Sequence, residues 1–465
     1  MLTLDIANCL SDRVGEHGLD PARIDASGPT GQAVAALTER LSRSRGSGME
    51  RWRDLAKDPM RSAHVSAVKR CVDERRGRFE NLVVLGIGGS ALGSIALHAA
   101  LNDPVYNALP NKARPGPRLF VLDNIDPDHF AAHLAALEKL GGLKKTLFNV
   151  VSKSGETAET AAQFMVVRER LKAALGKAHR ENLVVTTDPA RGTMRAICDH
   201  EGYPTLPVPE GVGGRFSVLS PVGLFSAAMC GIDIESLLDG AAEIDEACST
   251  TKLDENPAAM LAVVLVELAA RKGKSNHVLM PYCNALAALG DWWAQLWAES
   301  LGKRVQTVAG ENHVGFTPIR AVGATDQHSQ MQLYRDGPND KVVCFVEVER
   351  FREAVTIPEG LDAEAIGYLR GRTMAQLLAA EKRATEYALV ASGRPNLTIR
   401  LPVVDAHHVG QFIYLWELAT AYAGGMLGIN AYDQPAVELG KQATFGLMGR
   451  AGYEDLKEAV ERTLG

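Results

Sequence analysis

The chain has 465 residues, 46% hydrophobic and 23% charged, a balance typical of a globular protein with two or three domain-sized units. Its net charge of −6 excludes a general electrostatic attraction to nucleic acid or to an anionic membrane, so an anionic ligand needs local donors. The seven cysteines are scattered singly, which predicts neither a disulfide framework nor a structural zinc site. Free thiols and the absence of a signal-peptide pattern favour a cytoplasmic protein.

The first 45 residues predict polar helices that end at a Gly/Ser-rich break. From residue 81, short apolar runs alternate with longer amphipathic segments such as 159–175, which predicts a helix. The short runs predict strands at 81–85, 118–122, 146–151 and 182–186. Because these strands are apolar at nearly every position, we expect them to be buried on both faces of a parallel sheet.

A second cycle of strands and helices begins near residue 255. It predicts strands at 276–281, 342–348 and 397–401 and helices at 257–271, 285–301 and 409–427. We therefore predict an α/β fold with two doubly wound domains, mainly parallel sheets and helical terminal segments. The predicted boundaries are 1–45 for an N-terminal helical segment, 46–235 and 236–430 for the two domains, and 431–465 for a C-terminal helical arm.

The segment LGIGGSALG, residues 85–93, lies where a predicted strand leads into a helix. Its glycines allow a close backbone approach to a ligand, and the helix N-terminus offers unpaired N–H groups to an anion. Ser90 adds a hydroxyl, and Gly89 lies beside it. The segment also fits a dinucleotide-binding pattern, but the first acid at a strand end, Asp123, is too distant to hold a ribose. Phosphate binding, nucleotide binding and a structural turn all remain open for this segment.

A hydroxyl-rich loop, SKSGETAET, follows the strand at 146–151 and precedes a helix. It supplies hydroxyl groups from Ser152, Ser154, Thr157 and Thr160 and a cation from Lys153. Each hydrogen bond to a charged group contributes roughly 1.5–3 kcal/mol, so three or four would hold a phosphate without a basic protein around it. A helix cap is the structural alternative, although one cap does not require four hydroxyl groups.

Arg215 follows two glycines in the segment EGVGGRFSVLSPVG, residues 210–223. The glycines leave space for the guanidinium group to approach a ligand, and its planar donors suit a developing oxyanion. A surface ion pair is the structural alternative. Other candidates are dispersed and carry little weight singly: Glu299 at the end of a Trp-rich helix, His328 in TDQHSQ, and Gln434, Glu438 and Lys441 in YDQPAVELGK.

Together and in this order, the segments from about residue 50 to 445 resemble the glucose-6-phosphate isomerase family in its compact bacterial form. The segment 210–223 is similar to one family signature, and 432–441 is similar to the other. The chain departs from the second signature at Ala436, where the family usually has glycine, so we expect a methyl group to crowd the turn before Lys441. The loop SKSGET departs from the commoner Ser-Lys-Thr form but keeps a hydroxyl at Ser154.

The resemblance implies two sugar-isomerase (SIS) domains, an active site at their junction in a homodimer, and no metal or organic cofactor. It implies that Glu299 moves the proton between C1 and C2, that Arg215 stabilises a cis-enediolate, and that His328, from the partner subunit, and Lys441 assist ring opening. It assigns sugar and phosphate binding to Gly89, Ser90, Ser152, Lys153, Ser154, Thr157 and Gln434. The implied reaction converts glucose 6-phosphate to fructose 6-phosphate in glycolysis and gluconeogenesis.

Three alternatives remain. A phosphoglucose/phosphomannose isomerase would share the fold and use a wider range of substrates. A non-catalytic sugar-phosphate sensor would keep the Ser152 loop without needing Glu299, His328 and Lys441 together. An NAD-dependent dehydrogenase is disfavoured because no acid is placed to hold the ribose.

Overall fold

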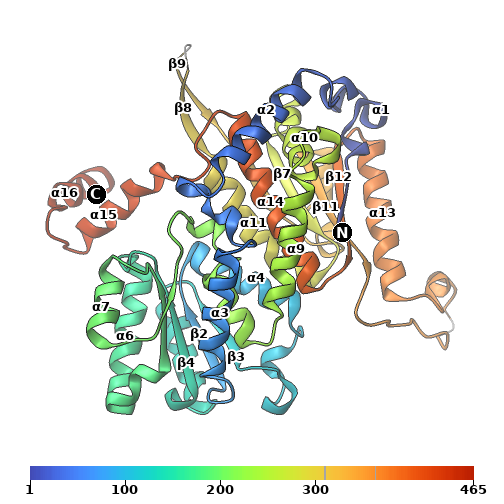
Figure 1. Cartoon of the computed structure of the whole chain (residues 1–465). Helices are drawn as coiled ribbons and strands as arrows, with labels where there is room; N and C mark the ends of the chain where they lie inside the picture. The colour runs from blue at the N-terminus through green and yellow to red at the C-terminus, as the bar shows by residue number, and fades with distance from the viewer. Residues whose placement is uncertain (308–309, 362) are drawn as a thin grey trace.

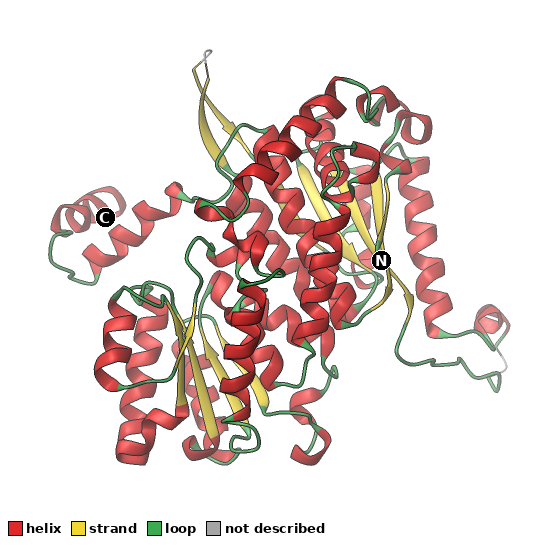
Figure 2. Cartoon of the chain, viewed as in Figure 1, coloured by secondary structure: helices red, strands yellow, loops and turns green. Residues whose placement is uncertain are grey.

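The computed structural model describes residues 1–307, 310–361 and 363–465. Two five-stranded sheets lie in separate regions of the molecule, and helices pack around each of them (Figures 1 and 2). The predicted α/β fold with two mainly parallel sheets is confirmed. In the described residues, no helix combines the length and the apolar character needed to cross a bilayer.

The first sheet has the strand order β3-β2-β4-β5-β6, and every neighbouring pair is parallel. Its strands are β2 (Asn81–Leu85), β3 (Arg118–Leu122), β4 (Thr146–Val151), β5 (Leu183–Thr187) and β6 (Thr205–Pro207). Strands β2, β4 and β5 are buried at every position, as their continuous apolar sequences predict. The helices of this region are α3 (Met60–Asp73), α4 (Leu92–Leu101), α5 (Pro127–Lys139), α6 (Ala158–Leu175), α7 (Thr193–Glu201) and α8 (Pro221–Met229).

The second sheet has the order β1-β12-β11-β7-β10, with β1 antiparallel and the other strands parallel. Its strands are β1 (Thr3–Asp5), β7 (Asn276–Pro281), β10 (Thr317–Arg320), β11 (Lys341–Arg350) and β12 (Asn396–Val403). The helices that follow in the chain are α9 (Ile234–Ala247), α10 (Pro257–Lys272), α11 (Ala287–Leu301), α12 (Met331–Asp336), α13 (Met374–Ala391) and α14 (Ala406–Met426).

The N-terminal segment differs from the helical prediction. It begins with strand β1, which pairs with Thr398–Arg400 of β12, and continues with α1 (Ser11–Val14) and α2 (Pro29–Ser44). A strand of three residues is too short to show an alternating pattern in the sequence, so the prediction of helices alone was wrong there.

The core joins the two regions and fixes helix α11. One hydrophobic cluster contains buried residues from both, including Leu82 of the first sheet and Ile399 of the second. Trp416 of α14 packs edge-on against Trp293 and Trp297 of α11, with ring centroids 5.3 and 5.4 Å apart. These fully buried rings hold α11 in place. Helix α11 carries Glu299 near its C-terminal end.

Two of the elements that lie away from the body of the molecule in Figure 1 bear on the predictions. One is the hairpin of β8 (Lys303–Thr307) and β9 (Gly310–Val314), which was not predicted. The other is the C-terminal pair of helices α15 (Glu438–Leu447) and α16 (Glu454–Leu464), which agree with the predicted helical arm.

Candidate active site

Arg215 is buried at the junction of three distant parts of the chain, with only 4% of its surface exposed. Its Nε donates to Ser300 Oγ at 2.7 Å, and its Nη1 donates to Gln434 Oε1 at 3.0 Å. Its Nη2 donates to the carbonyl oxygens of Ala431 and Asp433, at 2.7 and 3.1 Å. Burial lowers the pKa of Arg215, and the carboxylates of Glu299 and Asp433 oppose that effect. The guanidinium group is therefore a fixed, charged centre.

Glu299 lies beside Arg215, with its Oε1 3.5 Å from Arg215 Nη1. Its other carboxylate oxygen accepts a hydrogen bond from Gln295 Nε2 at 3.1 Å, one helical turn earlier on α11. About a quarter of the Glu299 side chain is exposed, so one side of the carboxylate remains open to a ligand. Helix α11 thus presents a held but accessible carboxylate next to a buried cation.

The two glycine-rich turns touch each other at this junction. A Cβ atom at Gly89 would lie 2.2 Å from the carbonyl carbon of Gly214, so a side chain at Gly89 would clash with the backbone that leads into Arg215. At Gly88, where φ is 56°, a Cβ atom would lie 2.9 Å from Gln295 Nε2. Glycine is therefore required at both positions for the turn after β2 to approach Arg215 and α11.

The hydroxyl-rich loop lies at the same sheet edge as the turn at 86–90, because β2 and β4 are adjacent and parallel. The chain leaves β2 toward β3 on one side and later returns to β4 on the other, so this edge contains the switch point of the sheet. Ligands bind at such points in open α/β sheets. The topology therefore brings Ser90 and the Ser152 loop to one edge.

Within the loop, some side chains shape the backbone and others face outward. Ser152 is 3% exposed, and its Oγ accepts a hydrogen bond from Gly155 N–H at 3.0 Å. Ser154 is exposed, and its Oγ accepts from Glu156 N–H at 3.1 Å. Thr157 is the N-cap residue of α6 but makes no side-chain cap bond, so its hydroxyl remains available beside unpaired N–H groups.

Two further loop residues have different positions. Lys153 Nζ donates to the carbonyl oxygen of Val212 at 3.3 Å, which ties the loop to the segment that carries Arg215. Thr160, included in the sequence pattern for its hydroxyl, is 1% exposed in the first turn of α6. Thr160 packs into the interior. Ser152, Ser154 and Thr157 are therefore the remaining hydroxyl candidates for contact with a ligand.

The C-terminal candidates separate into two groups. Gln434 contacts Arg215, whereas Glu438 and Lys441 lie on exposed α15, where Lys441 Nζ donates to Glu438 Oε1 at 2.8 Å. Ala436 is exposed, and in the described residues no amino acid other than glycine has a positive φ. The methyl group of Ala436 therefore faces solvent and does not crowd the turn before Lys441.

His328 is not brought to Glu299 within the chain. It is exposed in a short 3-10 helix, Thr325–His328, and Asp326 of that helix lines a cavity with Ala287 at the start of α11. Glu299 lies twelve residues farther along α11, a distance of about 18 Å at the rise of an α-helix. Within one chain, the structure therefore does not bring His328 and Glu299 together.

Three residues of this junction were missed in the sequence: Gln295, Ser300 and Lys303. Lys303 is 8% exposed at its side chain, and its Nζ donates to the carbonyl oxygens of Glu299 and Ser300 at 2.8 and 2.9 Å. Burial lowers the pKa of Lys303, as does the nearby charge of Arg215. For Gln295 the available signal was its position one helical turn before Glu299 on α11. Lys303 lies beyond the end of that helix, in β8, and had no such signal.

The arrangement combines a carboxylate, a buried cation and a separate anion grip, which suits proton abstraction from a carbon beside a carbonyl group in a phosphorylated substrate. The described residues contain no group of three or more His, Cys, Asp or Glu side chains arranged to hold a metal ion.

Residues 70–450 match the family model described as phosphoglucose isomerase. The glucose-6-phosphate isomerase of Carboxydothermus hydrogenoformans is 47% identical over 397 residues, covering 85% of this chain and 84% of that protein. The enzyme of the same name from Rubrobacter xylanophilus is 44% identical and covers 92% of this chain and 96% of its own length.

Two solved structures show the same fold. A hypothetical protein from Thermus thermophilus has a TM-score of 0.83 and 37% identity, over 97% of this chain and all of that one. A glucose-6-phosphate isomerase from Chlamydia trachomatis has a TM-score of 0.78 at 23% identity, over 99% of this chain and 95% of that one.

Proposed function

Because the chain belongs to the phosphoglucose isomerase family, we propose that Glu299 and Arg215 carry out its aldose–ketose isomerisation. The reaction is the reversible conversion of glucose 6-phosphate to fructose 6-phosphate, a step of glycolysis and gluconeogenesis. One observation supports these roles most strongly. Arg215 has five N–H donors and uses four of them within the chain, which leaves one Nη1 hydrogen on the side of Glu299.

In this proposal Glu299 takes the proton from C2 of the open-chain aldose and returns it to C1. The C2–H electron pair moves into a C1–C2 double bond, and the carbonyl oxygen gains negative charge in a cis-enediolate. The remaining Nη1 hydrogen of Arg215 donates to that oxygen, and the buried, fixed guanidinium needs no reorganisation to do so. The product forms when Glu299 returns the proton to C1 and the C2 hydroxyl passes its proton to the O1 oxyanion, so that C2 becomes the ketone carbon and C1 carries a hydroxyl group.

Substrate binding is assigned to the sheet edge beside this pair. Ser152, Ser154, Thr157 and Lys153 hold the phosphate with Ser90 from the neighbouring turn, and the N-terminus of α6 adds backbone donors. Gly89 and Gln434 position the sugar against Arg215. Binding energy from the phosphate orients the reacting carbons, which lie several bonds away.

Glu299→Gln tests the assignment of the base. We expect kcat to fall by roughly 10³- to 10⁴-fold, because general base catalysis contributes on that scale and an amide accepts no proton. Binding of fructose 6-phosphate, followed by isothermal titration calorimetry, should stay within about threefold, because Glu299 is not part of the phosphate grip. Glu458→Gln, at an exposed carboxylate on α16, is the matched control. Near-normal turnover in Glu299→Gln would contradict the mechanism.

We also propose that the active unit is a homodimer in which His328 of the partner subunit assists ring opening together with Lys441. The separation of His328 from Glu299 along α11 supports exchange between copies. Glu299→Gln and His328→Gln proteins, each inactive alone, should recover about a quarter of wild-type activity after unfolding and refolding as a mixture. Half of the dimers would then be mixed, and each would contain one intact site. If both residues acted within one chain, the mixture would stay inactive.

The cytoplasm is the proposed location of the enzyme. All seven cysteines are buried and unpaired, which suits a reducing compartment. Recovery of activity in the soluble cytosolic fraction after cell breakage, and its absence from the secreted fraction, is the expected result.

A further inference from the structure

Two cavities border the segment between α4 and β3, and Pro115 lines both of them. Neither includes Arg215, Glu299 or a residue of the Ser152 loop. Their linings differ in charge, and this difference identifies which of the two cavities is the candidate for binding an anion.

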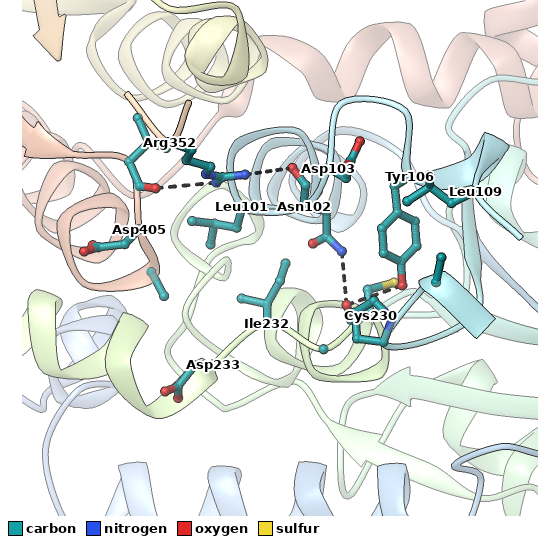
Figure 3. A pocket seen from close by; sticks show the side chains of 15 residues that line it. Leu101, Asn102, Asp103, Tyr106, Leu109, Cys230, Ile232, Asp233, Arg352 and Asp405 are labelled. Carbon is teal, nitrogen blue, oxygen red and sulfur yellow. Dashed lines mark hydrogen bonds between the residues drawn. The ribbon is translucent and has the colours of Figure 1, made fainter. Parts of the chain in front are cut away.

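In the first cavity, of about 410 Å³, the cation of the lining is Arg352, which is already hydrogen-bonded to the protein backbone (Figure 3). Arg352 donates to the carbonyl oxygens of Ala100, Asn102 and Val404, at 2.8, 3.2 and 3.4 Å. The other charged side chains in its lining are three carboxylates, Asp103, Asp233 and Asp405. Figure 3 shows the hydrogen bonds from Arg352 to backbone oxygen atoms. This cavity therefore offers an anion no uncommitted cation.

The second cavity, of about 330 Å³, is lined by four cations and one carboxylate: Arg75, Arg76, Arg114, Lys145 and Glu80. Among the described residues Glu80 forms no direct ion pair with any of the four, although its charge acts on Arg114. Arg75 and Arg76 pair with Glu74 and Asp73, which lie outside the lining. The lining therefore has an excess of positive charge, although the protein as a whole has a net charge of −6.

Arg75 is the most deeply placed of the four, with 7% of its side chain exposed. Its Nη1 donates at 2.9 Å to the carbonyl oxygen of Cys71 and to Glu74, so part of the guanidinium group closes the end of α3. Its Nε is buried without a hydrogen-bond partner, and no bond within the described chain uses its Nη2. A buried guanidinium with unused donors is costly unless another group satisfies them.

The other three cations divide between a fixed wall and an open rim. Arg114 is held by the carbonyl oxygens of Leu109 and Gly116 and by Asn111, so it forms the wall. Lys145 is half-buried, and within the described residues its ammonium group has no partner. Arg76 is exposed, with only a 3.6 Å ion pair to Asp73.

The cavity lies at the edge of the first sheet opposite the Ser152 loop. Glu80, Pro117 and Lys145 immediately precede strands β2, β3 and β4, whereas the loop follows the end of β4. Five residues of strand separate the two edges by about 17 Å. An anion bound at one edge would therefore not overlap one bound at the other.

From the four cations, the unused donors of Arg75 and the position of the hollow, we infer a second anion site that takes a small multivalent phosphate compound. Guanidinium groups pair with phosphate oxygens through two parallel hydrogen bonds, and Lys145 adds an ammonium group as a fourth positive charge. The volume is at the lower end of the range for small-molecule sites, which suits a compact ligand.

Calorimetric titration of the full-length protein with pyrophosphate tests this inference. The titration uses a Ser154→Ala/Thr157→Val background, so that binding at the Ser152 loop is weakened and the outcome does not depend on catalysis. Arg76→Gln/Lys145→Gln then removes two cations from the cavity. Arg70→Gln/Lys144→Gln is the matched control, because it removes the same charge from exposed neighbours that do not line the cavity.

We expect the background protein to bind one pyrophosphate per chain, the cavity variant to bind it at least about tenfold more weakly, and the control to stay within about twofold. Binding in the background should also weaken as sodium chloride is raised, because the rim cations are exposed. The inference is overturned if the background binds no pyrophosphate, or if the cavity variant and the control lose affinity equally. Circular dichroism of all variants verifies that they are folded.

Discussion

In the proposed site, the Arg215 junction and the Ser152 loop differ in how far their donors are already used within the chain. At the junction, four of the five donors of Arg215 are occupied by groups of the chain itself, and the side chain is 4% exposed. In the loop, Ser154 is exposed and the hydroxyl of Thr157 makes no cap bond. A group that must meet a developing charge is fixed in advance, whereas groups that only hold the substrate remain open to it.

The two regions should also contribute differently to the energetics of the proposed reaction. A preorganised cation lowers the barrier because it need not move when charge develops. Hydroxyl groups at a helix N-terminus bind ground state and transition state about equally, so they lower KM more than they raise kcat. Substitutions in the two regions should therefore change different kinetic constants.

Arg215→Lys should have the largest effect among tests of this contrast. A lysine cannot reach Ser300, Gln434 and the backbone carbonyls together, so we expect kcat to fall by roughly 10²- to 10³-fold. Acceptors left unsatisfied should also lower the free energy of unfolding by about 1–3 kcal/mol. Steady-state kinetics and denaturant unfolding measure the two effects. A change in KM alone would show that the junction only binds substrate.

Thr157→Val should have an intermediate effect, confined to binding. Loss of one hydrogen bond to phosphate should raise KM by roughly tenfold or more, with kcat within about threefold. Thr160→Val is the control, since Thr160 lies one turn later on α6 and is buried. Equal changes in the two variants would mean that the loop acts through the stability of α6 and not through contact with substrate.

Acid should leave the kinetic contrast least changed and act on stability, through His277 on β7 below the Arg215 junction. Burial lowers the pKa of His277 to about 3, and its Nδ1 accepts a hydrogen bond from Trp297 Nε1 at 2.9 Å. Below the ordinary value of about 6.5 the unfolded chain binds a proton that the folded chain rejects. The free energy of unfolding should therefore fall as pH drops from 6.5 toward 3, by up to about 1.4 kcal/mol per pH unit for this group.

His277→Gln should make that pH dependence shallower, as measured by urea unfolding at pH 7, 6 and 5. His64 and His98, whose pKa values burial lowers to about 4, contribute to the wild-type slope, so the difference between proteins is the relevant quantity. His200→Gln, at an exposed histidine, should leave the slope unchanged. An unchanged slope in His277→Gln would remove His277 as a source of acid sensitivity.

Much of the fold could be predicted from the sequence, because buried parallel strands have continuous apolar runs. The bounds of β2, β3, β4 and β7 were predicted to the residue. Strands β6 and β10 were missed. Each lies at an edge of its sheet, is three or four residues long and contains proline, so neither shows a periodic pattern.

The site was predictable in its residue types but not in its connections. The pattern around Arg215 indicated a cation near a ligand, yet nothing in the sequence showed that Ser300 and Gln434 hold it. Those partners are 85 and 219 residues away, and only the packing of α11 and the C-terminal segment brings them together. In the same way, the distance between His328 and Glu299 depends on the direction in which α11 runs. The number of residues between them in the sequence does not reveal that direction.

Strand β1 has a consequence for the order of events on the ribosome. Its partner, β12, ends about 400 residues later, so Thr3–Asp5 cannot pair until β12 has been made. At 5–20 residues per second, the first strand waits roughly 20 to 80 s for its neighbour. The first sheet, whose strands all lie within residues 81–207, can assemble during that time. Residues 3–5, which are synthesised long before β12, are therefore among the last to join a sheet.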